Sequence, residues 1–504
     1  MKATLELSGR LKDRKAVSRF FEELKEVLNK GVPQGQTGGG IKNLKVHDES
    51  IDLELESGRY VRPHDGILRL KKGLSDWLGR TQGIGVRNIK IVSYEVWAPV
   101  ENRTPQEITL PYTKSIEFEN QTAHIEFEDI DEAALEQRFV DRILRRFEEK
   151  LDEAEIGGKG EFSQSFKKSD SRLNRYQLKE DPTTLLEQKN WVQHFGRGVW
   201  TILPAYAALW NAIEGLVMEK VAKPLGFVEV MLPKIVPLDV QRKKGQLFGI
   251  PNEMWWVCPP HSRDPKKWEK FKDKVKITAD TNPEGLMENL SAPEFSLAYA
   301  QCEPFYSIWE KKTVDRDKLP LKFVDNYGPT WRYESGGLKG LERLSEFKRM
   351  EFVWIGSPED AIEIRDKVRD RSLDIIDKIF DLEWRVDATT AVYLEHAGEK
   401  ADEEDRDYAR TYDLTVSLPF ETVSRPEKEL EIASFHVHED HYAKNFYWKE
   451  KKKRPLWSGC AGISPTRWAY VFLLRHGFDY DGWPDEIKKR IGKSLPTLPD
   501  NLFM

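Results

Sequence analysis

Residues 329–355 read PTWRYESGGLKGLERLSEFKRMEFVWI. An apolar strand carrying Arg332 and Glu334 leads into a loop rich in glycine and charge, and the chain returns as a second apolar strand over 350–355. This order predicts a hairpin. A guanidinium binds phosphate oxygens through a planar fork, and an aromatic ring can stack on a base, so the stretch predicts a nucleotide site without a Walker loop. The loop carries Arg343, Phe347 and Arg349.

The composition indicates a folded protein of two or three domains, because the chain has 504 residues. Charged residues make up 33% and hydrophobic residues 39%, which excludes a disordered chain. With a net charge of -6, the protein would have to meet a polyanionic partner through a local basic face. No apolar run reaches the roughly 18 residues that span a bilayer, and the N-terminal segment has no signal-peptide core. Three cysteines are too few for a disulfide framework, so we expect a cytoplasmic protein without a membrane segment.

Residues 1–155 alternate between predicted strands and helices and contain few long apolar runs. The pattern predicts an α+β layer with an antiparallel sheet and helices on one side, whose last helix runs from about Glu132 to Leu151. Residues 156–185 are polar, contain glycine and lack periodicity. We interpret them as an interdomain linker.

Residues 186–504 form the second predicted domain. It opens with a long apolar helix, followed by a short strand that contains Pro233. A helix that is apolar on all sides is buried in a large core or against another subunit. A second long helix is expected from Ser357, a suitable N-cap, to about Leu382. An acidic insertion is expected at about 384–415.

Two further features of the second domain could bind ATP. Arg467 stands near the start of a predicted helix over 466–476, where free backbone N–H groups favour an anion. Glu431 and Ser434 on a predicted strand offer hard oxygen ligands for Mg²⁺. Considered alone, residues of this kind more often lie at a solvated helix end or on a solvent-facing strand.

Two cysteines and a carboxylate form a candidate metal site although they are far apart in the sequence. Cys302, Glu351 and Cys460 would give a tetrahedral Zn²⁺ three protein ligands and one open position, the arrangement of a functional rather than a structural zinc. There is no CxxC pair, and a free cysteine is usually a small buried apolar residue. The competing candidates are Cys258 and the histidines of the HVHEDH run, His436, His438 and His441.

Basic residues in the first domain form a candidate nucleic-acid surface. Arg69 and Lys72 are three residues apart on a predicted helix and so share a face. Arg87 follows the glycine-rich turn TQGIGV and could lie near them. Such a cluster suits contacts to a phosphate backbone, and an ordinary charged surface is the alternative.

The order of these elements resembles the catalytic core of class II aminoacyl-tRNA synthetases. KPLGFVEVMLPKI (223–235) is similar to motif 1, with its interface proline at Pro233, and PTWRYES (329–335) is similar to motif 2. GCAGISPTRW (459–468) resembles motif 3, although Thr466 replaces the usual glutamate before the arginine. The resemblance implies an α+β fold, with an antiparallel-sheet class II core and a separate N-terminal tRNA-binding domain.

A closer resemblance, over essentially the whole chain, is to the methanogenic (archaeal, atypical) seryl-tRNA synthetases. AQCEPFY (300–306), RMEFVWI (349–355) and WSGCAGI (457–463) resemble the zinc-ligand segments of that family. Its N-terminal α+β domain has a similar length and replaces the coiled-coil arm of ordinary seryl enzymes. The resemblance implies one active-site Zn²⁺ per subunit. The implied ligands are Cys302, Glu351 and Cys460.

The resemblance also implies a role for each nucleotide-binding residue. Arg332 would hold the α-phosphate, Glu334 the adenine edge, and Phe347 would stack on adenine. Arg343 and Arg467 would hold the γ-phosphate side. The two expected catalytic residues are therefore Arg332 and Arg467.

The remaining implied roles concern Mg²⁺, serine and tRNA. Glu431 and Ser434 would place the Mg²⁺ that accompanies ATP. The serine amino group would bind at the open position of the zinc held in part by Glu351, and the serine hydroxyl would meet Ser434 or His436. The residues implied in tRNA binding are Arg69, Lys72 and Arg87.

On this resemblance the chain is expected to be a homodimeric seryl-tRNA synthetase. It would activate L-serine with ATP and transfer the seryl group to tRNA(Ser), and also to tRNA(Sec). The alternatives are a ligase that loads a carrier protein, a non-catalytic paralogue that binds RNA, and a structural zinc protein. The 150-residue N-terminal domain disfavours the first. The joint presence of phosphate-binding arginines and zinc ligands disfavours the other two.

Overall fold

The computed structural model divides into two compact units, Met1–Gly160 and Glu161–Met504. None of the helices in its described part is long and apolar enough to cross a bilayer. The structure describes all residues except 37, 57–59, 101–107, 120, 156–162, 335–337, 390–407, 422–427 and 499–504, and the side chains of 25 and 152–155.

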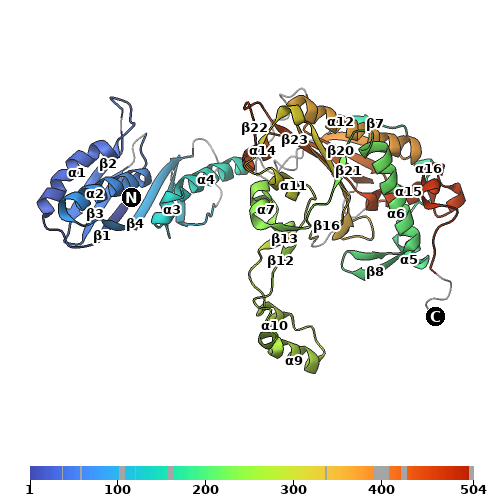
Figure 1. Ribbon diagram of the computed structural model, residues 1–504, viewed down its shortest axis with the longest axis horizontal. Coiled ribbons are helices and arrows are strands. Elements are labelled where there is room, and N and C mark those ends of the chain that lie inside the picture. The colour runs from blue at the N-terminus through green and yellow to red at the C-terminus, as the bar shows by residue number, and fades with distance from the viewer. Residues whose placement is uncertain are drawn as a thin grey trace. The chain divides into compact units, whose positions relative to one another are not determined.

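The first unit is a six-stranded antiparallel sheet in the order β2-β3-β1-β4-β6-β5, with α1 and α2 packed against one another (Figure 1). Strand β1 alternates as predicted, and its buried residues Ala3, Leu5 and Leu7 join the core. The predicted last helix is divided in two at Arg138, whose φ is 61°. The elements are β1 (Lys2–Leu7), α1 (Arg14–Leu28), β2 (Gly40–Val46), β3 (Ser50–Glu56), α2 (Pro63–Gln82), β4 (Val86–Pro99), β5 (Thr113–Glu119), β6 (Thr122–Phe127), α3 (Glu132–Glu136) and α4 (Phe139–Glu155).

The second unit is built on an eight-stranded sheet in the order β10-β15-β18-β23-β21-β20-β19-β7. Its pairings are antiparallel except the one between β10 and β15. Helices α6, α12 and α15 share the large core of this sheet. The elements are β7 (Ser163–Lys168), α6 (Pro204–Val217), β10 (Val228–Val230), β15 (Leu321–Asp325), β18 (Met350–Gly356), α12 (Pro358–Asp374), β19 (Trp384–Thr389), β20 (Thr411–Ser417), β21 (Glu429–Glu439), β23 (Trp457–Ile463) and α15 (Pro465–His476).

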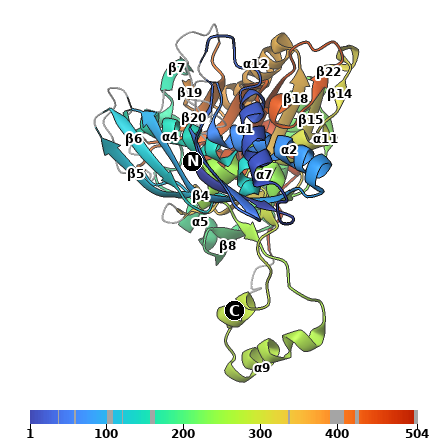
Figure 2. The ribbon, with the colours of Figure 1, turned by 90° about the vertical axis from the view of Figure 1, so that its left-hand side faces the viewer.

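Smaller elements surround this sheet. Helices α9 and α10 belong to an excursion between β12 and β13, seen below the sheet in Figure 2. The elements are α5 (Thr183–Gln188), β8 (Val192–Gly196), β9 (Val199–Ile202), β11 (Ile235–Pro237), α7 (Leu238–Lys244), α8 (Gln246–Gly249), β12 (Trp256–Val257), α9 (Glu269–Thr278), α10 (Pro283–Met287), β13 (Phe295–Leu297), α11 (Glu303–Ile308), β14 (Thr313–Val314), β16 (Pro329–Trp331), β17 (Glu346–Lys348), α14 (His441–Asn445), β22 (Lys449–Glu450) and α16 (Asp485–Ile491).

Strand β18 is buried on both faces, and its alternation positions the candidate site. Phe352 and Trp354 point into the large core with the helices. Val353 points to the opposite face, into a second apolar cluster that contains Cys302 and Cys460. Because successive side chains of a strand alternate between faces, Glu351 lies on the same face as Val353 and the two cysteines.

The hairpin predicted over 329–355 is shorter than expected. Strand β16 pairs with β17, which is Glu346–Lys348, and not with the strand that begins at Met350. That following strand, β18, pairs with β15 and β23 in the main sheet. Strand β17 has the sequence EFK, too short and too polar to show the alternation of a strand, so the prediction took the apolar run that starts at Met350 as the partner of β16.

The predicted linker and acidic insertion were placed too widely. Strand β7 lies inside 156–185 but pairs with β19 at the sheet edge. It is exposed on both faces and so lacks apolar alternation. The ends of 384–415 are the sheet strands β19 and β20, which pair with each other. Residues 156–162 and 390–407 lie outside the described residues.

The two long helices of the second domain differ in how well they were predicted. The expected apolar helix is preceded by a hairpin, β8–β9, and begins only at Pro204. The other prediction is confirmed at its start, where Ser357 caps α12 in a reciprocal capping box with Asp360. That helix continues as a π-helical turn to Ile379.

Candidate active site

One cavity of about 450 Å³ opens over β18, β21 and β23 in the second unit. Segments far apart in sequence meet in it because the antiparallel strands bring their side chains onto one face. It contains every residue predicted to bind ATP, serine or zinc. These lining residues are Cys302, Arg332, Glu334, Arg343, Phe347, Glu351, Glu431, Ser434, His436, Cys460 and Arg467.

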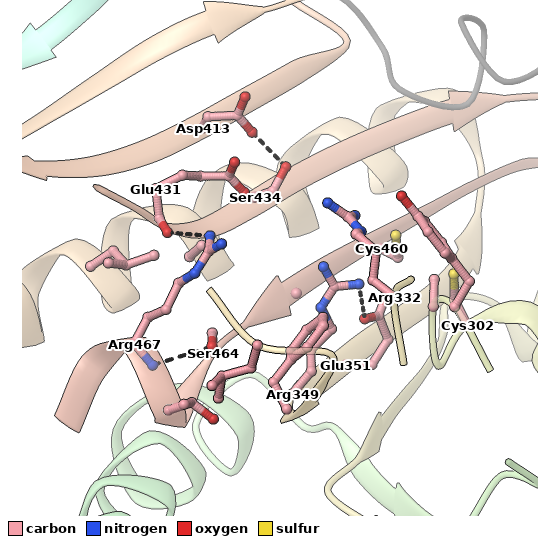
Figure 3. Close-up of a pocket in the computed structure, with 18 of the residues that line it drawn as sticks. Cys302, Arg332, Arg349, Glu351, Asp413, Glu431, Ser434, Cys460, Ser464 and Arg467 are labelled. Carbon is pink, nitrogen blue, oxygen red and sulfur yellow. Dashed lines mark hydrogen bonds and ion pairs between the residues drawn. The ribbon is translucent and has the colours of Figure 1, made fainter. Parts of the chain in front are cut away.

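A metal-ligand cluster forms one end of this cavity (Figure 3). Ligand atoms of Cys302, Glu351 and Cys460 all lie within 4.8 Å of one another, and the three residues are buried. Glu351 Oε2 has no hydrogen-bond partner among the described residues, and its nearest cation is Arg349 Nη1 at 3.8 Å. Two sulfur atoms and an unsatisfied buried carboxylate oxygen are a donor set that suits Zn²⁺. The residues present therefore fit a three-ligand zinc site.

The two thiols of the cluster differ in their ease of ionisation. A hydrogen bond from the Cys460 thiol lowers the pKa of Cys302, and the same contact raises the pKa of Cys460. Lys244 Nζ lies 3.1 Å from Cys302 Sγ, and His438 Nε2 lies 3.4 Å from Cys460 Sγ. Cys302 is thus the thiol that ionises first, as metal binding requires.

Arg332 is held in place at the mouth of the cavity by two residues of neighbouring segments. Its guanidinium lies 4.6 Å from the centre of the Tyr299 ring, and its Nε lies 3.8 Å from Glu253 Oε2. The Tyr299 hydroxyl donates to the same carboxylate at 2.7 Å. These contacts orient a guanidinium that can bind phosphate oxygens.

The other predicted nucleotide contacts are grouped around the motif 2 loop. Arg343 and Glu334 form an ion pair at 2.7 Å, so each already has a partner in this structure. The Arg349 guanidinium lies 5.9 Å from the centre of the Phe347 ring. An aromatic face and a planar cation side by side could together hold a base.

Arg467 lies at the opposite end of the cavity from the cysteines (Figure 3). The Ser464 side chain caps α15 by accepting from the Arg467 backbone N–H at 3.3 Å. The guanidinium of Arg467 reaches back to donate to the Glu431 carbonyl oxygen at 2.6 Å. The start of this helix therefore presents a cation next to a carboxylate-bearing strand, which suits a metal–phosphate group.

Four polar side chains on β20 and β21 form a hydrogen-bonded chain. The Ser434 hydroxyl donates to Asp413 Oδ1 at 2.6 Å and lies 2.8 Å from His436 Nε2. His436 Nδ1 lies 3.0 Å from the Thr411 hydroxyl. Since the Ser434 proton is used on Asp413, His436 donates from Nε2 and accepts at Nδ1. Burial, followed by the charge of Arg349, lowers the pKa of His436 to about 3, so the ring is neutral at physiological pH.

Comparison with known proteins identifies the family. Residues 1–149 match a tRNA-binding domain, and residues 287–473 match the tRNA synthetase class II core domain (G, H, P, S and T). The type-2 serine–tRNA ligase of Methanopyrus kandleri is 35% identical, covering 96% of this chain and 94% of that protein. The type-2 serine–tRNA ligase of Methanococcoides burtonii is 34% identical, covering 95% and 94%. The chain belongs to the type-2 serine–tRNA ligases.

Solved structures agree with this assignment. The crystal structure of M. kandleri SerRS in complex with A. aeolicus tRNASec matches with a TM-score of 0.84 and 34% identity, covering 99% of this chain and 98% of that chain. The cytoplasmic serine–tRNA ligase of Naegleria fowleri in complex with AMP matches with a TM-score of 0.50 at 14% identity, which supports the fold alone. The predicted class II core and N-terminal tRNA-binding domain are confirmed for this type-2 serine–tRNA ligase.

Sequence reasoning missed several residues of the ligase site. Lys244 and Asp413 line the cavity, as do Glu253 and Tyr299, and none of them was assigned a role. Lys244 ends the charged run QRKK, which suggests an exposed helix end. Only the pairing of β20 with β21, which places Asp413 opposite Ser434, could have revealed that aspartate.

The competing metal candidates have separate positions. Cys258 is partly exposed and does not line the cavity. His438 does line it, beside Cys460, whereas His441 begins α14 and lies 3.1 Å from the Asn445 side chain. The three histidines therefore do not form a site of their own among the described residues.

The predicted tRNA-binding residues of the N-terminal unit differ in their surroundings. Arg69 donates to the carbonyl oxygens of Leu28 and Lys30, at 3.0 and 3.1 Å, and so caps the C-terminus of α1. Lys72 is exposed on α2. Arg87 is also exposed and lines a shallow depression with Lys71.

Proposed function

We propose that this type-2 serine–tRNA ligase activates L-serine with ATP to form seryl-adenylate and then transfers the seryl group to tRNA(Ser). The observation that carries the proposal is that one cavity holds both a zinc-competent cluster and a set of phosphate-binding arginines. The first can recognise an amino acid and the second a nucleotide. A carrier-protein ligase or a non-catalytic paralogue would not explain a matched N-terminal tRNA-binding domain together with this complete cavity.

Activation needs the serine carboxylate to attack the α-phosphorus in line, with pyrophosphate as the leaving group. Arg332 would bind α-phosphate oxygens, where the preorganised contacts with Tyr299 and Glu253 hold its guanidinium in advance. Arg467 would neutralise charge on the leaving pyrophosphate. Glu431 and Ser434 would place the Mg²⁺ that accompanies ATP. Catalysis by these residues consists of positioning and charge stabilisation.

Serine recognition would depend on the metal cluster. Cys302, Glu351 and Cys460 would hold Zn²⁺, which when bound supplies an open coordination position for the serine amino group. Ser434 and His436 offer neutral polar atoms for the serine hydroxyl. Alanine lacks this hydroxyl and would forgo the hydrogen bond, which favours serine.

Four further properties belong to the proposal: assembly, tRNA contacts, acceptor range and location. A row of apolar side chains around motif 1, Val228, Met231 and Ile235, is 62%, 71% and 52% exposed, which favours a homodimer through this surface. Arg69, Lys72 and Arg87 would contact tRNA phosphates. Because the related M. kandleri enzyme was crystallised with tRNASec, we extend the substrate range to tRNA(Sec). The enzyme would work in the cytoplasm, where thiol ligands stay reduced.

The amino-acid-dependent exchange of pyrophosphate into ATP tests the proposal. Purified full-length protein should exchange with serine and hold about one Zn²⁺ per chain. Exchange driven by glycine or alanine in preference to serine would refute the assignment of the amino acid. Aminoacylation of tRNA(Ser) and tRNA(Sec) transcripts then measures the range of acceptors.

A further inference from the structure

Lys244 is a buried cation beside the cluster and has no part in the mechanism described above. It is the last residue of α7, which ends at Gly245 in the left-handed region with φ of 93°. Its two neighbours on the helix, Arg242 and Lys243, form ion pairs with Asp239. Lys244 instead turns inward and is only 5% exposed.

The contacts of Lys244 are made by a sulfur atom and two aromatic rings. Its ammonium lies 3.1 Å from Cys302 Sγ, the one hydrogen-bond acceptor it has within the described part of the chain. The ammonium also lies 5.6 Å from the centre of the Tyr306 ring and 5.3 Å from that of Tyr442. Two aromatic rings and a sulfur atom thus surround the ammonium and hold it in place.

The negative charges of the cluster explain why a cation is buried beside it. Two thiolates and one carboxylate carry three negative charges in a buried site, and Zn²⁺ would compensate only two of them. A buried uncompensated charge is costly, and the structure places a cation beside two of the three ligands, Lys244 at 3.1 Å from Cys302 and Arg349 at 3.8 Å from Glu351.

We propose that Lys244 is a positioning residue of the zinc site, which orients Cys302 by an N–H···S hydrogen bond and offsets the negative charge of its thiolate. This inference rests on the proposed zinc site. Mutation of a residue that hydrogen-bonds to a metal ligand typically lowers metal affinity by about 10–100-fold.

The test is the zinc dissociation constant of the full-length protein, measured by competition with a chromophoric chelator at pH 7.5. Lys244→Met keeps the apolar stem and removes the charge and the N–H donor. Lys243→Met is the matched control, because its side chain is 10% exposed on the same helix and it also loses ion pairs, with Asp239 and Glu310. Lys244→Gln retains a neutral donor and serves in place of the Met variant should that protein not fold.

We expect Lys244→Met to bind zinc about 10–100-fold more weakly, and Lys243→Met to remain within about twofold of wild type. In Co²⁺-substituted protein, the thiolate-to-cobalt charge-transfer band should shift in the Lys244 variants and not in the control. Wild-type zinc affinity in Lys244→Met, with zinc present in the wild-type protein, overturns the role of Lys244 alone. Absence of zinc affinity in the wild-type protein overturns the zinc site and this inference with it.

Discussion

Glu351→Gln is the substitution that most directly tests the site. The amide has nearly the shape of the carboxylate, so packing is retained while one anionic ligand is lost. The Glu351 side chain is only 2% exposed, and water therefore has little room to replace the missing ligand. The change isolates the contribution of a single ligand to metal binding.

The expected magnitude follows from the ligand count. Structural zinc sites with four ligands bind with about 10–16 kcal/mol of apparent free energy, or about 2.5–4 kcal/mol per ligand. Since about 1.4 kcal/mol is a factor of ten, the loss of Glu351 should weaken zinc binding roughly 10²–10³-fold. The KM for serine in pyrophosphate exchange should rise with it, while the KM for ATP stays close to wild type.

For the zinc-free protein we expect Glu351→Gln to have the opposite effect, on the free energy of unfolding. In the zinc-free protein, Glu351 Oε2 is buried without a hydrogen-bond partner. Leaving such a group unsatisfied costs about 1–3 kcal/mol, so the neutral amide should make zinc-free Glu351→Gln at least as stable as the zinc-free wild type. Thermal unfolding of both proteins in chelator measures this, and it shows that any zinc loss is not a consequence of misfolding.

The control is Glu342→Gln, which alters another buried glutamate of the cavity that is 2% exposed and does not belong to the cluster. It should leave zinc affinity within about twofold of wild type. If Glu351→Gln binds zinc within threefold of a zinc-containing wild-type protein, the assignment of Glu351 as a ligand is wrong.

Three further predictions concern ATP, assembly and pH. Arg467→Ala should lower the rate of pyrophosphate exchange about 10²–10³-fold with little change in the KM for serine, because it removes charge stabilisation from the phosphate end; an unchanged rate would show that Arg467 does not contact ATP. Met231→Asp places a charge on the exposed row around motif 1, so light scattering should report a shift from dimer to monomer, and a dimer of unchanged stability would exclude that surface. The pKa of His476 is lowered from 6.5 to about 4, chiefly by burial, so the unfolded state binds the extra proton and stability falls as the pH drops below 6.5. Between pH 7 and pH 5 this amounts to about 2 kcal/mol, which His476→Gln should abolish in urea titrations at the two pH values; an equal pH dependence in both proteins would contradict the argument.

Residues with a strong local signal were predicted well. Ser357 before Pro358 marks a helix start through capping chemistry that is local to a few residues, and the structure has the full capping box there. The motif 2 arginine, Arg332, and the motif 3 arginine, Arg467, both line the cavity, and their roles in phosphate binding stay predictions. Helix caps and short motifs depend on residues that are neighbours in the sequence, so they can be predicted without knowledge of the fold.

Residues whose role depends on packing could not be predicted in this way. Lys244 follows two other basic residues, and nothing in QRKK indicates which of its side chains turns inward. Strand β7 is polar along its length, because an exposed edge strand has no buried face to impose alternation. Strand β17 was missed because its three residues, EFK, carry no apolar pattern, whereas the apolar strand β18 that follows pairs in a different sheet.

The sequence by itself determined the family, the two-part organisation and the residue types of the site, because motif spacing and capping are local properties of the chain. Only the tertiary structure decided that Cys302, Glu351 and Cys460 meet within 4.8 Å. Antiparallel pairing of β18 with β23, together with the alternation of side chains along each strand, brings the second and third of these residues onto one face. The first arrives from a loop more than a hundred residues from Cys460, at a position set by the packing of α11 over that face. Long-range packing therefore brings three residues that are scattered in the sequence into one buried cluster of metal-ligand atoms.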